Sequence, residues 1–150
     1  MKVIMLGSMP PQRGISSYCL ELSKNLSKEV VIEFISFKKM YPSFLYPGGG
    51  LEEDRTFPNI ENNKIKIRRN LTYYNPITWI TESIKTKGDV FHAQFWSFPL
   101  CYIYFFMLSA YKIRGYKTIM TIHNVIPHES GFISKFISKQ LYKLPKVLIV

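Results

Sequence analysis

Three histidines stand at points of the sequence where chemistry could take place. His92 lies inside the apolar run DVFHAQFW, and Gln94 follows it two residues later. His123 ends the run KTIMTIHN, and Asn124 and His128 follow it in the segment TIHNVIPHES. Because imidazole changes charge near neutral pH, it serves proteins as an acid, a base or a metal ligand. We therefore treat these three histidines as candidate site residues. Because His92 lies inside an apolar strand, it is either such a site residue or a core residue with its hydrogen bonds satisfied.

Two familiar kinds of site are disfavoured by the residue pattern. The histidines lack the regular spacing of a zinc site, and neither Cys19 nor Cys101 joins them. A serine hydrolase is disfavoured because the chain has no G-x-S-x-G turn. The two cysteines have no spacing typical of a disulfide framework, and the start MKVIML lacks the features of a signal peptide. Both observations favour the cytoplasm.

A loop with the sequence GSMPPQRGISSY joins a predicted strand to a predicted helix. The first N–H groups of such a helix and its dipole favour an anion in front of them, and Gly14 would let a ligand approach the backbone. The loop has neither the Walker pattern nor the G-x-G-x-x-G pattern. It is therefore either a phosphate-binding loop or an ordinary turn with a glycine for clearance.

The elements that must position these residues alternate along the chain. Apolar or alternating runs predict strands over 2–6, 30–37, 64–69, 89–96, 117–124 and 146–150, the third of them exposed or at an edge. Helical spacing of apolar residues predicts helices over 16–28, 75–88, 99–115 and 131–143. This alternation predicts an α/β fold, a Rossmann-like parallel sheet with helices on both faces.

Three loops follow strands of this sheet, over residues 7–14, 95–99 and 123–131. We expect them to line one crevice, because ligands of such sheets bind at the carboxyl ends of the strands. The long segment 38–63 is either a functional loop or contains a short element that the sequence does not reveal.

Composition limits the classes of partner. The 150 residues are 47% hydrophobic and 20% charged, which predicts one folded domain. Twenty lysines and arginines against ten acidic residues give a net charge of +10, which favours nucleic acid, phosphorylated small molecules or an anionic membrane surface. Scattered lysines and aromatic residues at core positions argue against nucleic acid. Since the chain ends inside an apolar strand, we expect the domain to be incomplete.

Two segments raise the question of a membrane. The stretch from Val90 to Tyr111 is long enough to span a bilayer, but its polar residues and Pro99 favour a strand, a turn and a buried helix. The segment FISKFISKQLYKLPK places Phe132, Ile133, Phe136, Ile137 and Leu141 on one helical face. Such a basic amphipathic helix either lies in a lipid headgroup layer or covers the sheet with its lysines in solvent.

In order and spacing, PPQRGISSY, DVFHAQFW and TIHNVIPHES resemble the N-terminal domain of GT-B glycosyltransferases of family 4, over nearly the whole chain. This resemblance implies that the first loop lies under the diphosphate of a nucleotide-sugar, with Gly14 and the amide of Ile15 contributing. Arg13 stands where many members have a second glycine. The resemblance also implies that His123 lies at the centre of sugar transfer.

The remaining expected site residues are assigned to the substrate. They are Arg13, His92, Gln94, Asn124 and His128, with His92 in the acceptor-side wall. The resemblance implies transfer of a hexose from a nucleotide-diphosphate sugar to a polysaccharide or lipid-linked acceptor, without a metal or other cofactor. It implies a cytoplasmic protein, peripheral on the inner face of the membrane.

Family members carry a second, donor-binding domain with a basic pair and a Glu-x7-Glu element near the donor sugar, and these 150 residues do not supply that domain. The resemblance therefore implies that activity needs a separate C-terminal half. The alternative is a non-catalytic binding subunit or a truncated relic.

Overall fold

The computed structural model describes residues 1–12, 14–42, 60–124 and 132–150. The elements are β1 (Lys2–Leu6), α1 (Ser16–Leu26), β2 (Val31–Lys39), β3 (Ile65–Thr72), α2 (Pro76–Lys85), β4 (Val90–Phe95), the short 3-10 helix η2 (Phe98–Leu100), α3 (Cys101–Ile113), β5 (Lys117–Ile122), α4 (Phe132–Leu141) and β6 (Val147–Ile149). Each strand and α-helix expected from the sequence is present, with ends within about three residues of the expected ones.

The six strands form one sheet in the order β3-β2-β1-β4-β5-β6, and every neighbouring pair is parallel. This is the strand order of the Rossmann fold. The chain first builds the sheet outward from β1 through β2 to β3 and then returns to add β4 on the other side of β1. The switch point of the topology therefore lies between β1 and β4, and β3 is the edge strand that its sequence predicted.

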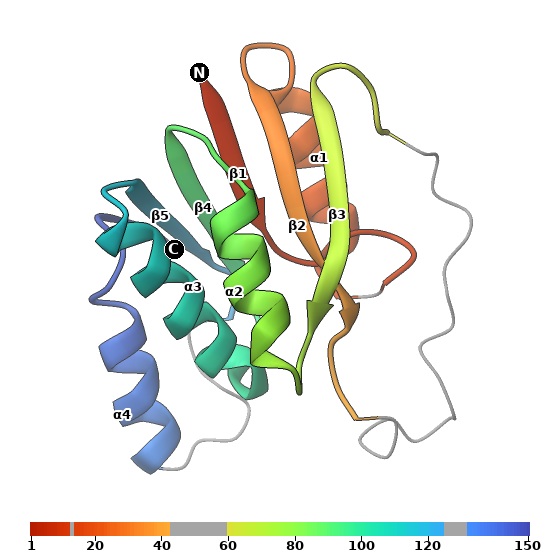
Figure 1. Ribbon diagram of the computed structural model, residues 1–150. Coiled ribbons are helices and arrows are strands. Elements are labelled where there is room, and N and C mark those ends of the chain that lie inside the picture. The colour runs from red at the N-terminus through yellow and green to blue at the C-terminus, as the bar shows by residue number, and fades with distance from the viewer. Residues whose placement is uncertain (13, 43–59, 125–131) are drawn as a thin grey trace.

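Helices cover both faces of the sheet, as Figure 1 shows, with α1 behind it and α2, α3 and α4 in front. Side chains alternate along the strands, so each strand contributes to two cores. The larger core lies under the three front helices and includes Phe91, Tyr104 and Met107. The smaller core lies under α1 and includes Met5 and Phe34. The expected α/β fold with a Rossmann-like parallel sheet is confirmed.

The helices begin in two different ways. At α2, the Oδ1 atom of Asn75 accepts a hydrogen bond of 3.0 Å from the N–H of Ile77, and Pro76 takes the first helical position. Both features are typical of helix starts. At α1, Ile15 stands at the N-cap position, and no side chain caps the helix. The first N–H groups of α1 therefore have no side-chain acceptor of the kind that α2 has.

One buried ion-pair network fastens α2 to the sheet. The carboxylate of Glu82 on α2 accepts two hydrogen bonds from the guanidinium of Arg68 on β3 and one from Asn70. Glu33 on β2 lies 3.7 Å from the same guanidinium. Both glutamates are buried, and the hydrogen bond to Glu82 is the main cause that raises the pKa of Arg68 further above its ordinary value. The network fixes α2 across β2 and β3.

Candidate functional site at the carboxyl edge of the sheet

The described parts of the three predicted loops meet beside the switch point. The N–H of His123, just after β5, donates to the carbonyl of Phe95 at 2.8 Å, and the side chain of Asn124 donates to the carbonyl of Trp96 at 2.9 Å. A Cβ atom on Gly14, in the loop after β1, would lie 3.3 Å from Nε1 of Trp96. The carboxyl ends of β1, β4 and β5 therefore form one continuous edge.

The loop between β1 and α1 is held by contacts with the neighbouring strands. The N–H of Met9 donates to the hydroxyl of Ser36 on β2 at 3.0 Å, and the guanidinium of Arg69 on β3 donates to the carbonyl of Pro10 at 3.1 Å. The side-chain amide of Gln12 donates to the carbonyl of Phe37. These three contacts place the loop in front of the sheet edge before any ligand arrives.

Hydrogen-bond donors gather where this loop enters α1. The helix starts without a side-chain cap, and no acidic residue lies in its first turn. Gly14 has a φ of +95°, and a Cβ there would lie 3.9 Å from the hydroxyl of Ser8. Among the described residues, that buried hydroxyl has no hydrogen-bond partner. N–H groups without a side-chain cap, a helix dipole and a hydroxyl without a described partner together favour a phosphate group.

A chain of hydrogen bonds joins the two predicted histidines through Gln94. The amide nitrogen of Gln94 lies 3.0 Å from Nε2 of His92, and its amide oxygen lies 3.0 Å from Nε2 of His123. The hydroxyl of Thr121 lies 2.8 Å from the same nitrogen of His92. With this amide orientation Gln94 donates to His92 and accepts from His123. The proton of His92 is therefore on Nδ1, and that of His123 is on Nε2.

Both histidines are neutral at pH 7. Burial, aided by the nearby His123, lowers the pKa of His92 to about 4, and burial also lowers the pKa of the half-buried His123. A neutral His123 that donates through Nε2 presents Nδ1 as an acceptor, which can take a hydrogen bond or a proton from a hydroxyl group. The ring of Tyr18 on α1 packs edge-on against His123, with 4.6 Å between the ring centres, and fixes its orientation.

Of the predicted site residues that the structure describes, some lie along the carboxyl edge and others are buried behind it. Gly14, Ile15, His123 and Asn124 lie along the carboxyl edge, where the sequence placed them. His92 and Gln94 are buried, and His92 lies beside Met5 of β1, which belongs to the smaller core.

The sequence assigned His92 to an acceptor-side wall, and in the structure its ring is buried. With its ring buried against Gln94 and Thr121, it supports His123 from behind. Arg13 and His128 lie outside the described residues, as does most of the segment 38–63.

Four residues of the site were not singled out from the sequence. Trp96 follows the end of β4 directly and Ser8 lies two residues after the end of β1, and such positions are a usable signal in a parallel sheet. Tyr18 and Thr121 gave no such signal, because their roles depend on contacts with residues far away in the chain.

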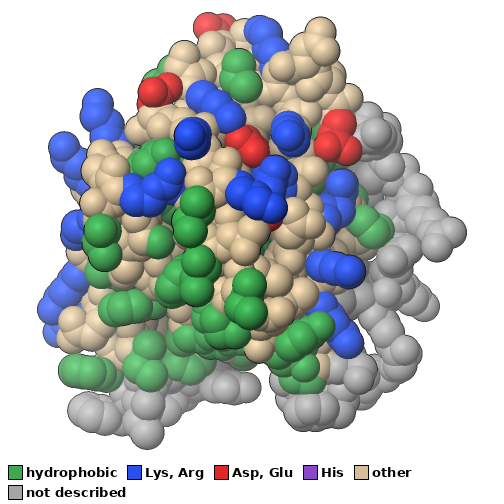
Figure 2. Space-filling model, viewed as in Figure 1, with side chains coloured by type: hydrophobic (Ala, Val, Ile, Leu, Met, Phe, Trp, Pro, Cys, Tyr) green, Lys and Arg blue, Asp and Glu red, His purple; other side chains and the backbone are tan. Residues whose placement is uncertain are grey.

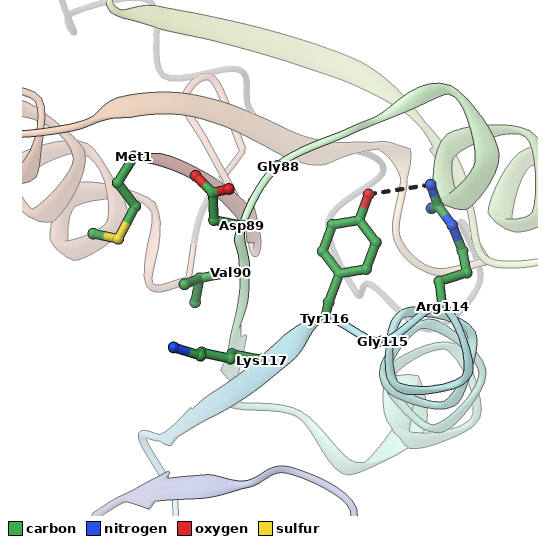
Figure 3. A pocket seen from close by; sticks show the side chains of 8 residues that line it. All are labelled: Met1, Gly88, Asp89, Val90, Arg114, Gly115, Tyr116 and Lys117. Carbon is green, nitrogen blue, oxygen red and sulfur yellow. Dashed lines mark hydrogen bonds between the residues drawn. The ribbon is translucent and has the colours of Figure 1, made fainter.

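A surface pocket of about 540 Å³ lies at the opposite edge, beside the amino ends of β4 and β5 (Figure 3). Arg114 lines this pocket, and its guanidinium donates hydrogen bonds to the carbonyl of Ser83 and to the hydroxyl of Tyr116. The guanidinium also lies over the rings of Tyr111 and Tyr116. The guanidinium is thus engaged within the protein. Since ligands of parallel sheets bind at the carboxyl ends, we place the functional site at the other edge.

No family model matches the chain, and no curated protein is significantly similar to it. In the described parts of the chain, no group of three or more histidine, cysteine or acidic residues could hold a metal ion. No helix of those parts combines the length and the hydrophobicity needed to cross a membrane.

Proposed function

We propose that this chain is the acceptor-side half of a GT-B glycosyltransferase. It would transfer a hexose from a nucleotide-diphosphate sugar to a polysaccharide or a lipid-linked acceptor. The observation that carries the proposal is the meeting of two features at the switch point. An uncapped helix start suited to phosphate lies beside a neutral histidine whose orientation is fixed by Tyr18 and Gln94.

The start of α1 is the proposed contact with the donor. Gly14, the amide of Ile15 and the hydroxyl of Ser8 would face the diphosphate, and the indole N–H of Trp96 lies close enough to add a donor. The absence of an acidic residue in the first turn of α1 supports this role, because a carboxylate there would repel a phosphate.

His123 is the proposed catalytic residue. Its Nδ1 atom would accept a hydrogen bond from a hydroxyl group of the acceptor or of the transferring sugar. That contact would hold the reacting groups in place and stabilise the sugar during transfer. Asn124, which is exposed beside it, and Arg13 and His128 of the adjoining loops would contact the substrates.

The rest of the proposal follows from the resemblance of the three motifs. The donor-binding half would come from a separate protein or segment, and transfer would need no metal or other cofactor. The protein would act in the cytoplasm, on the inner face of an anionic membrane that presents the lipid-linked acceptor.

Transfer of radiolabelled sugar tests this function. A panel of nucleotide-sugars is supplied to native membrane extract, with this chain alone and with the protein encoded directly downstream. We expect transfer only when both proteins are present. We further expect His123→Ala to abolish it and Asn25→Ala, an exposed polar change on α1, to leave it unchanged.

Two results of this transfer experiment would contradict the proposed function. If folded protein gives no transfer with any donor, or if His123→Ala transfers as well as the native protein, the chain is a binding subunit or a relic. The histidine chain is then a structural feature of the sheet.

A further inference from the structure

We propose that the outer face of α2, α3 and α4 docks this protein onto an anionic lipid surface. Several large apolar side chains on these helices are exposed to solvent, among them Ile77, Ile80, Ile84, Tyr102, Phe105 and Phe136. We call these six residues the helical apolar face. In Figure 2 the hydrophobic side chains of the front helices gather into a patch over the lower part of the molecule.

This apolar face is additional to the one that covers the sheet. On α2 the core is contacted by Trp79, whereas Ile77 and Ile84 are 69% and 60% exposed on the other side of the helix. On α3 the core contains Tyr104 and Met107, while Phe105 between them points outward and is 45% exposed. A helix that only covers a sheet is expected to be polar on its outer side. Large exposed apolar patches mark interaction surfaces.

The charges around the face point to an anionic partner. The only acidic residue in α2, α3 and α4 is Glu82, which is buried and bonded to Arg68. The exposed charges on or directly after these helices are basic: Lys85, Lys87, Lys112, Arg114, Lys135 and Lys139. Figure 2 shows lysines and arginines gathered above the apolar patch.

Apolar side chains beside lysines and arginines match a bilayer with acidic headgroups. A second copy of this chain would instead bring the same positive charges together, which opposes self-association.

The sequence alone located only part of this surface. It placed Phe136, Ile137 and Leu141 on one apolar side of the last long helix. In the structure Leu141 is fully buried in the core, while Phe136 is 57% exposed and Ile137 37% exposed. The larger part of the surface comes from α2 and α3, and the sequence predicted α3 as a buried helix.

This inference deepens the proposed function, and it rests on that function only for the identity of the acceptor. The carboxyl ends of β2 and β3 point toward the lower part of Figure 1, the side on which the apolar patch of Figure 2 lies. Docking through this face would therefore bring the edge that holds His123 near the lipid surface. A lipid-linked acceptor would reach the site from there.

Sedimentation with vesicles tests the apolar part of the surface. The full chain is mixed with vesicles of phosphatidylglycerol and phosphatidylcholine in equal parts, and with vesicles of phosphatidylcholine alone. We expect binding to the anionic vesicles at low salt. The double variant Ile77→Ser, Ile84→Ser should need at least about tenfold more lipid for half-maximal binding. The matched control Val31→Ser, at a 42% exposed residue on β2, should bind like the native protein.

A second pair of variants tests the basic part. Lys85→Gln combined with Lys139→Gln should weaken binding to anionic vesicles by about tenfold, because each lysine loses its attraction to the acidic headgroups. The control Lys28→Gln, at an exposed lysine after α1 on the other face of the sheet, should have no effect. All these changes are at exposed side chains, and circular dichroism checks that each variant is folded.

The proposal is overturned if the native chain does not bind anionic vesicles, or if the serine variant binds them as well as Val31→Ser does. It is also overturned if sedimentation velocity shows a dimer that the serine variant abolishes, because the face is then an interface between copies. None of these readouts requires sugar transfer. Vesicle binding without transfer would remove the transferase proposal and leave the docking surface.

Discussion

At the scale of single residues, Gln94 links the two histidines of the candidate site. Its side chain is fully buried, and its amide reaches both His92 and His123. The carbonyl of the same residue accepts a hydrogen bond of 2.8 Å from the buried hydroxyl of Tyr104. A residue held on both sides in this way controls which nitrogen of His123 is free to act. Gln94 is therefore a positioning residue for the proposed reaction.

The buried ring of His92 makes stability depend on pH. In the folded protein its pKa is lowered to about 4, whereas in the unfolded chain it titrates at its ordinary 6.5. Between these values the unfolded chain binds a proton that the folded protein excludes. Stability should fall by roughly 3 kcal/mol as the pH drops from 6.5 to 4, and this group causes no further loss below that range.

Chemical denaturation at a series of pH values measures this effect. In His92→Asn, the free energy of unfolding should depend clearly less on pH between 6.5 and 4 than it does in the native protein. His123, whose pKa is also lowered, accounts for part of the dependence that remains. Identical slopes in the two proteins would show that His92 is not kept neutral by the fold.

At the scale of elements, α2 is held by a buried charge. Glu82→Gln removes the carboxylate and leaves Arg68 partly buried beside the more distant Glu33. Loss of one member of a buried ion pair is strongly destabilising, so we expect a loss of roughly 3 kcal/mol in the free energy of unfolding. Urea denaturation measures it.

The exposed pair of Glu21 and Lys24 on α1 provides the control. Glu21→Gln breaks an ion pair of 2.7 Å between side chains that are largely in solvent, so it should cost less than about 1 kcal/mol. Equal effects of the two substitutions would mean that Glu82 does not anchor α2.

The elements themselves were largely predictable, and their contacts were not. Asn75 and Pro76 predicted the start of α2, and the alternation in KIKIRR predicted an exposed or edge strand. Both predictions were possible because these sequence signals are local. The exposed side of α3 could not be found in the same way. Its sequence is apolar on nearly every side, so periodicity gives no direction to Phe105. The pairing of Glu82 with Arg68 likewise depends on how α2 lies across the sheet.

The candidate site was predictable to a similar extent. Strand-end positions marked Gly14 and His123, because the carboxyl ends of parallel strands share one edge. The sequence left His92 open as a core residue or a site residue, and the partners that bury it, Gln94 and Thr121, were not predictable because Thr121 lies far away in the chain. The missing cap of α1 could be suspected only from Ile15, an apolar residue at a position that usually carries a polar one.

At the scale of the whole molecule, the two edges of the sheet offer two rival sites. The carboxyl edge has the uncapped helix start, the free hydroxyl of Ser8 and the oriented His123. The amino edge has the pocket beside Arg114 (Figure 3). The strand order favours the carboxyl edge, and the net charge of +10 favours an anionic ligand at either.

A titration with pyrophosphate followed by NMR decides between these edges most directly. We expect shifts of the amide signals of Gly14, Ile15 and Ser16 and of the indole N–H of Trp96, while the amide of Gly88 beside the amino-edge pocket stays in place. Gly14→Ala should remove this binding, because the added Cβ would contact Trp96 and because φ is +95° there.

Gly115→Ala, at the other positive-φ glycine with φ of +82° and no atom within 4 Å of the added Cβ, should bind pyrophosphate like the native protein. Shifts confined to the amino edge, an absence of shifts, or equal binding by both alanine variants would contradict a phosphate site at the carboxyl edge of this sheet.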